Sequence, residues 1–121
     1  MLKLLETIEY ADDYGDSVDT VKVHRVEGTV QLAGDSIWQY TGPQTVNVKE
    51  VQVIDTQYTD DDPALNESYR NVRVLHDANW RIYTDSGFEK AISEFLGYDV
   101  GFTEQGMQDN FRASMEQKKR G

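Results

Sequence analysis

Valine alternates with polar residues along two stretches of this chain, and in each stretch the valines change parity part-way. They move from odd to even positions in the first stretch and from even to odd in the second: Val21, Val23, Val26 and Val30, then Val46, Val48, Val51 and Val53. Successive side chains of a strand point to opposite faces, so this change moves the valines to the other face unless an extra residue is absorbed. The pattern therefore predicts two long strands with β-bulges or sharp twists near Arg25–Val26 and Lys49–Glu50. Two such strands side by side indicate a strongly curved sheet.

Shorter segments with strand-like patterns surround these two stretches. Residues 37–40 (Ile-Trp-Gln-Tyr) predict a short strand between them. Residues 68–76 and 79–84 predict two further strands, joined by a hairpin turn at residues 76–79. The first dozen residues fit the period of a helix and that of a strand, and the pattern leaves both open.

Residues 86–97 carry a complete set of helix signals. The apolar residues of this segment fall on one face at helical spacing: Phe88, Ala91, Ile92, Phe95 and Leu96. Ser86 and Glu89 have the spacing of a capping box. Gly97 follows the last apolar residue, as is common where a helix ends. We therefore expect one amphipathic helix here.

The last segment, residues 103–118, has a narrower helical stripe of Met107, Phe111 and Met115. A stripe of this kind packs on the protein's own sheet or on a partner, and the partner can be a second copy of the chain. A homodimer that uses these three residues therefore stays open.

These elements predict an α+β fold. We expect a curved, mostly antiparallel sheet of about five strands with an amphipathic C-terminal helix packed on one face. Residues 103–121 would add a second short helical tail. At this length, residues 1–121 are expected to form a single domain.

The negative charge of the chain is concentrated in its first 69 residues. The 121 residues hold 22 acidic and 12 basic side chains, a formal net charge of −10. Residues 1–69 hold 14 acids and four bases, whereas residues 70–121 hold eight of each. Acidic loops commonly serve to keep a small domain soluble. The alternative is a coherent negative surface that attracts a basic partner.

Two acidic clusters account for most of the surplus, and tyrosines lie among them. The first comprises Asp12, Asp13, Asp16 and Asp19, and the second Asp55, Asp60, Asp61, Asp62 and Glu67. Tyrosine beside acidic residues is typical of interaction surfaces, where buried tyrosines often anchor the partner. The residues that we expect to bind are Asp12, Asp13, Tyr14, Asp16, Tyr58, Asp60, Asp61 and Asp62.

Composition excludes several classes of protein. The chain has no cysteine, which rules out disulfide scaffolds, thiolate metal sites and cysteine nucleophiles. No segment approaches the ~20 apolar residues of a membrane span, and the first residues lack the pattern of a secretory signal. We therefore expect a cytoplasmic protein with no membrane contact. A sequence pI near 4.5 argues against direct binding of nucleic acid.

No motif identifies a metal, a cofactor or a catalytic residue. The acidic clusters miss the spacing of a calcium loop, because Ser17 and Leu65 stand where glycine is needed. His24 and His76 are interpreted as surface or hydrogen-bonded imidazoles. Nucleophile elbows, phosphate-binding glycine loops and zinc-protease motifs are missing from the sequence. We expect no cofactor and no metal site, and whether the chain is an enzyme stays open.

Three aromatic residues, Trp38, Tyr40 and Trp80, fall on predicted strands. If they share the concave face of a curved sheet, they line a pocket. Large aromatic residues more commonly belong to the core, and this is the competing interpretation for both tryptophans.

The sequence therefore favours a small acidic interaction protein, without catalytic activity, that binds a basic protein partner. In its sharper form the protein imitates nucleic acid, with carboxylates in place of phosphates. The alternative is a small-ligand-binding protein or enzyme that uses an aromatic-lined cleft between sheet and helix.

Overall fold

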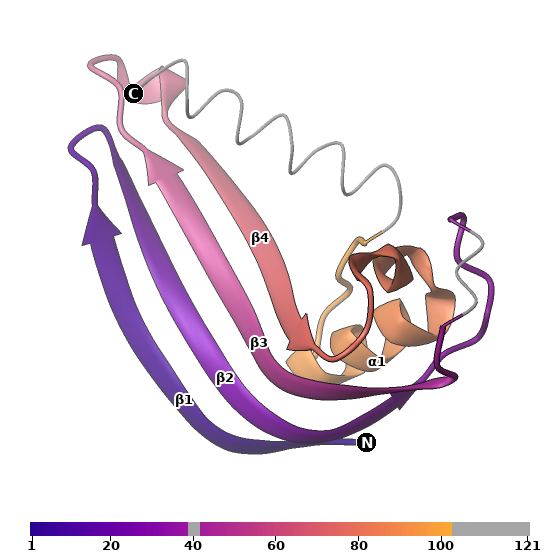
Figure 1. Ribbon diagram of the computed structural model, residues 1–121. Coiled ribbons are helices and arrows are strands. Elements are labelled where there is room, and N and C mark those ends of the chain that lie inside the picture. Colours follow the sequence, from indigo (N-terminus) through magenta and orange to yellow (C-terminus); the bar gives the residue numbers. More distant parts are fainter. Residues whose placement is uncertain (39–41, 103–121) are drawn as a thin grey trace.

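A computed structural model describes residues 1–38 and 42–102 of the chain. Its elements in chain order are β1 (Leu2–Asp13), β2 (Ser17–Gln31), β3 (Thr45–Tyr58), η1 (Pro63–Leu65), β4 (Glu67–His76), η2 (Trp80–Thr84) and α1 (Ser86–Leu96). The four strands form one antiparallel sheet in the order β1-β2-β3-β4. Helix α1 packs against one end of this sheet (Figure 1). The predicted α+β class with an antiparallel sheet is confirmed.

The strand register shifts at the positions where the valines change parity. β2 slips against β3 between Arg25 and Thr29, and β3 slips against β4 between Val48 and Glu50. Both predicted irregularities are therefore confirmed, and β1 has a third one between Leu4 and Glu6. The sheet as a whole is not curled, which corrects the expectation of a strongly curved sheet. Its long strands bend along their length instead (Figure 1).

The sheet has four strands and not the predicted number of about five, because two short segments take other conformations. Ile37 and Trp38 lie in a turn. Trp80–Thr84 forms the 3-10 helix η2, in which the Asn79 side chain accepts a hydrogen bond from the amide of Arg81 at 3.1 Å. Ile82 is the buried residue of this 3-10 helix. A single apolar position between polar ones resembles the alternation of a strand, but here it belongs to one helical turn. The ambiguous first dozen residues form β1.

Helix α1 follows the prediction along its length but not at its first residue. The N-cap is Asp85, whose carboxylate accepts hydrogen bonds from the amides of Gly87 and Phe88. The predicted capping box is therefore wrong: Glu89 accepts a hydrogen bond from the amide of Phe102 at 3.1 Å instead. The short side chain of Asp85, directly before the helix, accepts hydrogen bonds from the first free amides, so Asp85 is the N-cap. Gly97 ends the helix in the left-handed conformation, as predicted.

The core lies between α1 and one face of the sheet, which we call the inner face. Valines of β2, β3 and β4 pack there against the helix and the segment after it; the cluster comprises Val26, Val30, Leu32, Val46, Val48, Val51, Val53, Val72, Val74, Ile82, Phe88, Ile92, Val100 and Phe102. The ring of His24 meets that of Phe95 on α1 at 5.8 Å, so His24 also lies on the inner face. We call the opposite side of the sheet the outer face.

Part of the prediction lies outside the described residues. This applies to the helical tail at residues 103–121, with Met107, Phe111 and Met115, and to Tyr40.

Candidate interaction surface

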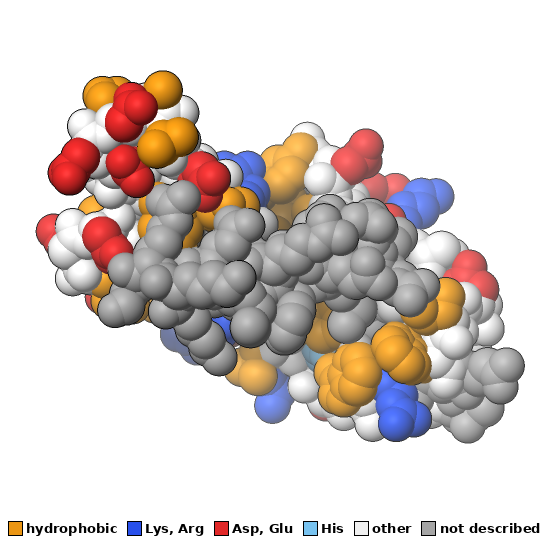
Figure 2. Space-filling model, turned by 90° about the horizontal axis from the view of Figure 1, so that it is seen from above, with side chains coloured by type: hydrophobic (Ala, Val, Ile, Leu, Met, Phe, Trp, Pro, Cys, Tyr) orange, Lys and Arg blue, Asp and Glu red, His pale blue; other side chains and the backbone are white. Residues whose placement is uncertain are grey.

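Both acidic clusters lie at the same end of the sheet. β1 ends and β2 begins there, and β3 ends and β4 begins there, because the order is antiparallel. The register places Ser17, the first residue of β2, directly opposite Tyr58, the last residue of β3. We call residues 10–20 and 55–69 the acidic end. It contains nine acidic residues and no basic one, and Figure 2 shows acidic side chains gathered around it.

Some of these carboxylates build the turns in which they lie. Asp13 accepts a hydrogen bond from the amide of Gly15 at 2.9 Å. Asp60 and Asp62 accept bonds from amides two residues further on, both at 3.0 Å. Asx-type bonds of this kind hold tight turns in shape. The turns therefore depend in part on the carboxylates that they expose.

Other carboxylates have no such structural role. Within residues 1–38 and 42–102, the side chains of Asp12, Asp16 and Asp61 are exposed and accept no hydrogen bond from one another or from a neighbour. Their charges are held at the surface by the backbone alone. They are the part of the acidic end that a partner can neutralise without disturbing a turn.

The acidic end repels further negative charge. Asp12 stands directly opposite Asp19 across β1 and β2, and like charges in that arrangement are unfavourable. The carboxylate of Asp12, with smaller contributions from desolvation and Asp19, raises the pKa of the Tyr14 phenol above its usual value. The local potential is therefore negative around Tyr14.

The two predicted tyrosines have different surroundings. Tyr14 is 59% exposed in the β1–β2 turn and is available for contact. Tyr58 is only 2% exposed, and its ring meets that of Tyr69 at 5.8 Å. Tyr58 therefore supports the acidic end from inside.

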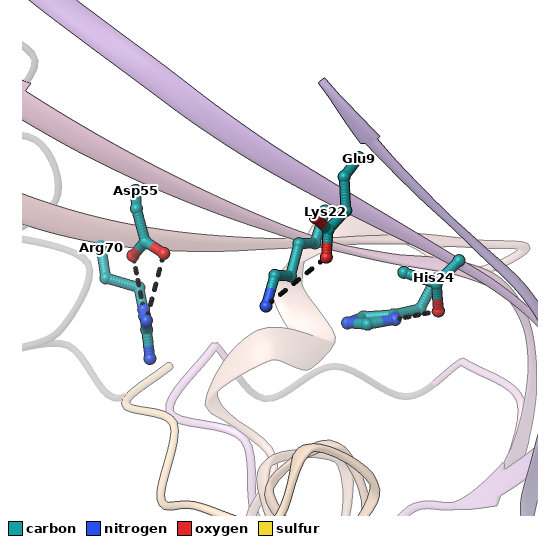
Figure 3. Close-up of polar contacts among 6 residues, drawn as sticks. Glu9, Lys22, His24, Asp55 and Arg70 are labelled. Carbon is teal, nitrogen blue, oxygen red and sulfur yellow. Dashed lines mark hydrogen bonds and ion pairs between the residues drawn. The ribbon is translucent and has the colours of Figure 1, made fainter. Parts of the chain in front are cut away.

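Two basic residues of the inner face, Lys22 and Arg70, are paired with carboxylates. Arg70 forms two hydrogen bonds to Asp55, at 2.6 and 3.1 Å, and Lys22 lies 3.7 Å from Glu9 (Figure 3). These pairs cancel charge on the inner face, so the negative surplus lies beyond them, at the turns.

The same view shows His24, which shares a 2.9 Å hydrogen bond with the hydroxyl of Thr7 (Figure 3). Burial lowers the pKa of His24 below its usual value, and nearby Lys22 adds to the effect. A neutral ring that packs on Phe95 is the structural imidazole expected from the sequence.

The two tryptophans contact each other in the structure. The rings of Trp38 and Trp80 meet edge to face at 5.5 Å, and they are 44% and 50% exposed. The expectation that they belong to the core is therefore wrong. Ser36 links the two loops, since its hydroxyl donates to the carbonyl of Arg81 at 2.9 Å. Two grooves of about 700 and 760 Å³ border α1, and neither is lined by these tryptophans.

A group of apolar residues on the outer face was not foreseen. The register pairs Tyr10 with Val21 and Val21 with Ile54, and it pairs Ile8 with Val23. Directly opposed residues share a face. His24 lies on the inner face, so its neighbour Val23, and with it Val21, points outward. The change of valine parity in β2 could have predicted this group. In this strand, Val21 and Val23 lie on the outer face, whereas Val26 and Val30 belong to the core.

None of the helices in the described ranges is long and apolar enough to cross a membrane. Across those same residues, no three or more His, Asp or Glu side chains converge in a way that would hold a metal ion. Comparisons with protein-family models, with curated proteins and with solved structures find no match to this chain.

Proposed function

We propose that this chain is a small acidic interaction protein, without catalytic activity of its own, whose acidic end binds a basic protein partner. The observation that carries the proposal is the meeting of two acidic clusters, more than 30 residues apart in sequence, at one end of the sheet. Asp55 is paired with Arg70, and the surplus charge of the other acidic residues of this end attracts a basic partner over several ångströms and speeds its association.

The competing explanation is solubility alone, and the arrangement of the charges speaks for binding. Charges that only keep a protein dispersed have no need to gather on one side. Here the surplus collects at the hairpin turns, while Lys22 and Arg70 each have an acidic partner on the inner face. The exposed ring of Tyr14 at the same turns offers apolar contact area among the carboxylates.

In its sharper form, the proposal is that the carboxylates take the place of phosphates on a nucleic-acid-binding protein. The basic partner would then be a protein whose own ligand is nucleic acid. Duplex DNA or RNA would compete with this chain for that partner, because both would occupy one basic site.

The test is affinity capture with matched charge variants as bait. The triple variant Asp12→Asn, Asp16→Asn, Asp61→Asn removes three carboxylates that have no described structural contact. Surface pairs contribute about 0.2–1 kcal/mol each, so we expect the apparent affinity for the partner to fall about tenfold. The control variant Glu27→Gln, Glu94→Gln, Asp99→Asn removes the same charge from exposed positions elsewhere.

Capture from the native lysate is run with all three baits, and bound protein is eluted with rising salt. We expect basic proteins to be retained by the wild type and the control and lost from the triple variant. The proposal is wrong if the triple variant retains the same proteins, or if salt does not elute them. Addition of duplex DNA or RNA to the capture then tests the mimicry.

A second candidate function, binding of a small planar ligand, rests on the exposed Trp38–Trp80 pair. Both tryptophans of the chain belong to this pair, so the tryptophan fluorescence of the protein reports on it directly. A ligand that stacks there would change this emission, and Trp80→Ala would abolish the change. Unchanged emission across a library of aromatic metabolites would remove this candidate.

A further inference from the structure

The outer face of the sheet carries a small apolar patch formed by Ile8, Tyr10, Val21, Val23 and Ile54. Ile8 and Tyr10 are 47% and 49% exposed, although both lie in the middle of β1. Val21 is only 4% exposed, yet it does not belong to the core cluster of the inner face. Its cross-strand neighbours Tyr10 and Ile54 flank it on either side. Val21 at the centre of the patch is therefore covered, whereas Ile8 and Tyr10 at its edge stay open to solvent.

This patch is continuous with the acidic end. The cross-strand row next to Tyr10 and Val21 consists of Asp12 and Asp19, which lie on the same face because they are two residues along each strand. Asp12 is exposed, and Asp19 accepts a hydrogen bond from the Thr56 hydroxyl at 2.6 Å. Apolar side chains are therefore bordered by carboxylates on the side toward the hairpin turns.

The opposite border of the patch carries no net positive charge that would repel a basic partner. Arg25 pairs with Glu6 at 2.6 Å in the next cross-strand row. Glu50 stands beside Arg25 in the same row. Arg73 is exposed on the same face, beyond Gln52 in the row of Ile8 and Val23, and adds one positive charge at the β4 side. The patch therefore has a negative border toward the hairpin turns, and the charges favour a basic segment on the β1 side, away from Arg73.

We infer that the outer face binds a basic amphipathic segment of the partner protein, with the apolar side chains of that segment on Ile8 and Tyr10 and its Lys or Arg side chains on Asp12 and the hairpin turns. The inference rests on the proposed function. It narrows the partner from any basic protein to one that contains a segment with one apolar face and one basic face. Charge complementarity at the border selects this occupant over a second copy of this acidic chain, whose own carboxylates would meet those of the first.

The test uses two synthetic peptides of about 14 residues, or about four helical turns. One has leucine at helical spacing with lysine elsewhere, and the other has serine in place of each leucine, so both carry the same charge. We expect the full chain to bind the Lys/Leu peptide about tenfold more tightly than the Lys/Ser peptide. Binding of both peptides should weaken as salt rises.

The double variant Ile8→Thr, Tyr10→Thr removes the apolar rim and keeps residues that favour strands. We expect it to bind both peptides equally, with the affinity for the Lys/Ser peptide unchanged within about twofold. The control Ile37→Thr removes an equally exposed apolar side chain (54%) from a loop and should keep the tenfold preference. Circular dichroism of each variant confirms that the sheet is retained.

The outcomes separate this inference from the function on which it rests. Equal, salt-dependent binding of both peptides by the wild type would overturn the inference and leave the acidic end as a binding surface. Binding of neither peptide would count against both. A dimer in sedimentation that Ile8→Thr, Tyr10→Thr converts to a monomer would assign the patch to a second copy and overturn the inference.

Discussion

The backbone amide of Thr59 donates a 3.0 Å hydrogen bond to the carbonyl oxygen of Asp16, and this bond joins the β1–β2 turn to the end of β3. The two acidic turns are therefore connected to each other as well as to the sheet. A bond between neighbouring turns keeps their carboxylates together although they repel one another.

Salt should stabilise this protein. The carboxylates of the acidic end repel one another, and ions shorten the range of that repulsion to about 10 Å at 0.1 M. We expect the melting temperature to rise by a few degrees between low and high NaCl concentration. Asp12→Asn, Asp16→Asn, Asp61→Asn should melt higher at low salt and respond less to added NaCl. The control Glu27→Gln, Glu94→Gln, Asp99→Asn should respond as the wild type does, and an equal response of the two variants would contradict the prediction.

Asp85 should be the most sensitive carboxylate of the fold. It is 2% exposed, and its two oxygens accept hydrogen bonds from five amides: those of Ala33, Gly34, Asp35, Gly87 and Phe88, at 2.7 to 3.3 Å. Asp85→Asn would point an NH₂ group at some of these donors and leave them unsatisfied. We expect the free energy of unfolding to fall by about 2–4 kcal/mol, measured with urea. Glu94→Gln, on the exposed side of α1, should change it by less than about 0.5 kcal/mol.

Gly28 should not tolerate a side chain. Its φ of 139° is disfavoured for other residues, and a Cβ there would collide with the carbonyl oxygen of Met1, the residue before β1. We expect Gly28→Ala to lower the free energy of unfolding by about 2 kcal/mol or more, because backbone must move. Gly15→Ala is the matched control: its φ is also positive, at 92°, but nothing lies within 4 Å of the added carbon. An equal loss in both variants would show that the contact with β1 is unimportant.

His76 should make the protein less stable in mild acid. Burial lowers the pKa of His76 below its usual value, and its Nδ1 accepts a hydrogen bond from the amide of Ala78 at 3.0 Å. The neutral form is therefore favoured in the folded state. Its contribution is fully present above the unfolded pKa of about 6.5 and is lost as the pH falls from there through the lowered folded value.

The measurement compares urea unfolding of wild type and His76→Asn at about pH 8 and pH 5.5, on either side of the usual histidine pKa. Asparagine keeps an acceptor for Ala78 but does not titrate. We expect the variant to be less stable at the higher pH, and the difference between the two proteins to shrink at the lower pH. His24, whose pKa is also lowered, contributes the same trend in both proteins. A difference that is independent of pH would contradict the assignment.

The periodic parts of β2, β3 and α1 could be predicted from the sequence, because each of these elements buries residues at its own spacing. The bulges near Arg25 and Lys49 and the apolar stripe of α1 all follow from that condition. The short segments could not be predicted. Trp80–Thr84 alternates like a strand, yet the side chain of Asn79 and the burial of Ile82 fix one turn of 3-10 helix.

The acidic end could be predicted in part. The charge surplus of residues 1–69 is visible in sequence, but the meeting of the two clusters depends on which strands are neighbours. The apolar patch on the outer face was missed for a related reason. The sequence does not show which face Val21 and Val23 occupy. The contact between His24 and Phe95 identifies the inner face, and only then are the two valines placed on the outer one.

The described core and the hairpin turns occupy different ends of the sheet. Asp13, Asp60 and Asp62 hold the turns in shape, whereas Asp12, Asp16 and Asp61 make no such bond and can be replaced with small effects on folding. Such a protein can acquire a new specificity by replacement of Asp12, Asp16 and Asp61 while the valines of the core stay the same. The fold would then serve as a scaffold for grafted recognition loops, in the way that other small sheets carry variable tips on a constant frame.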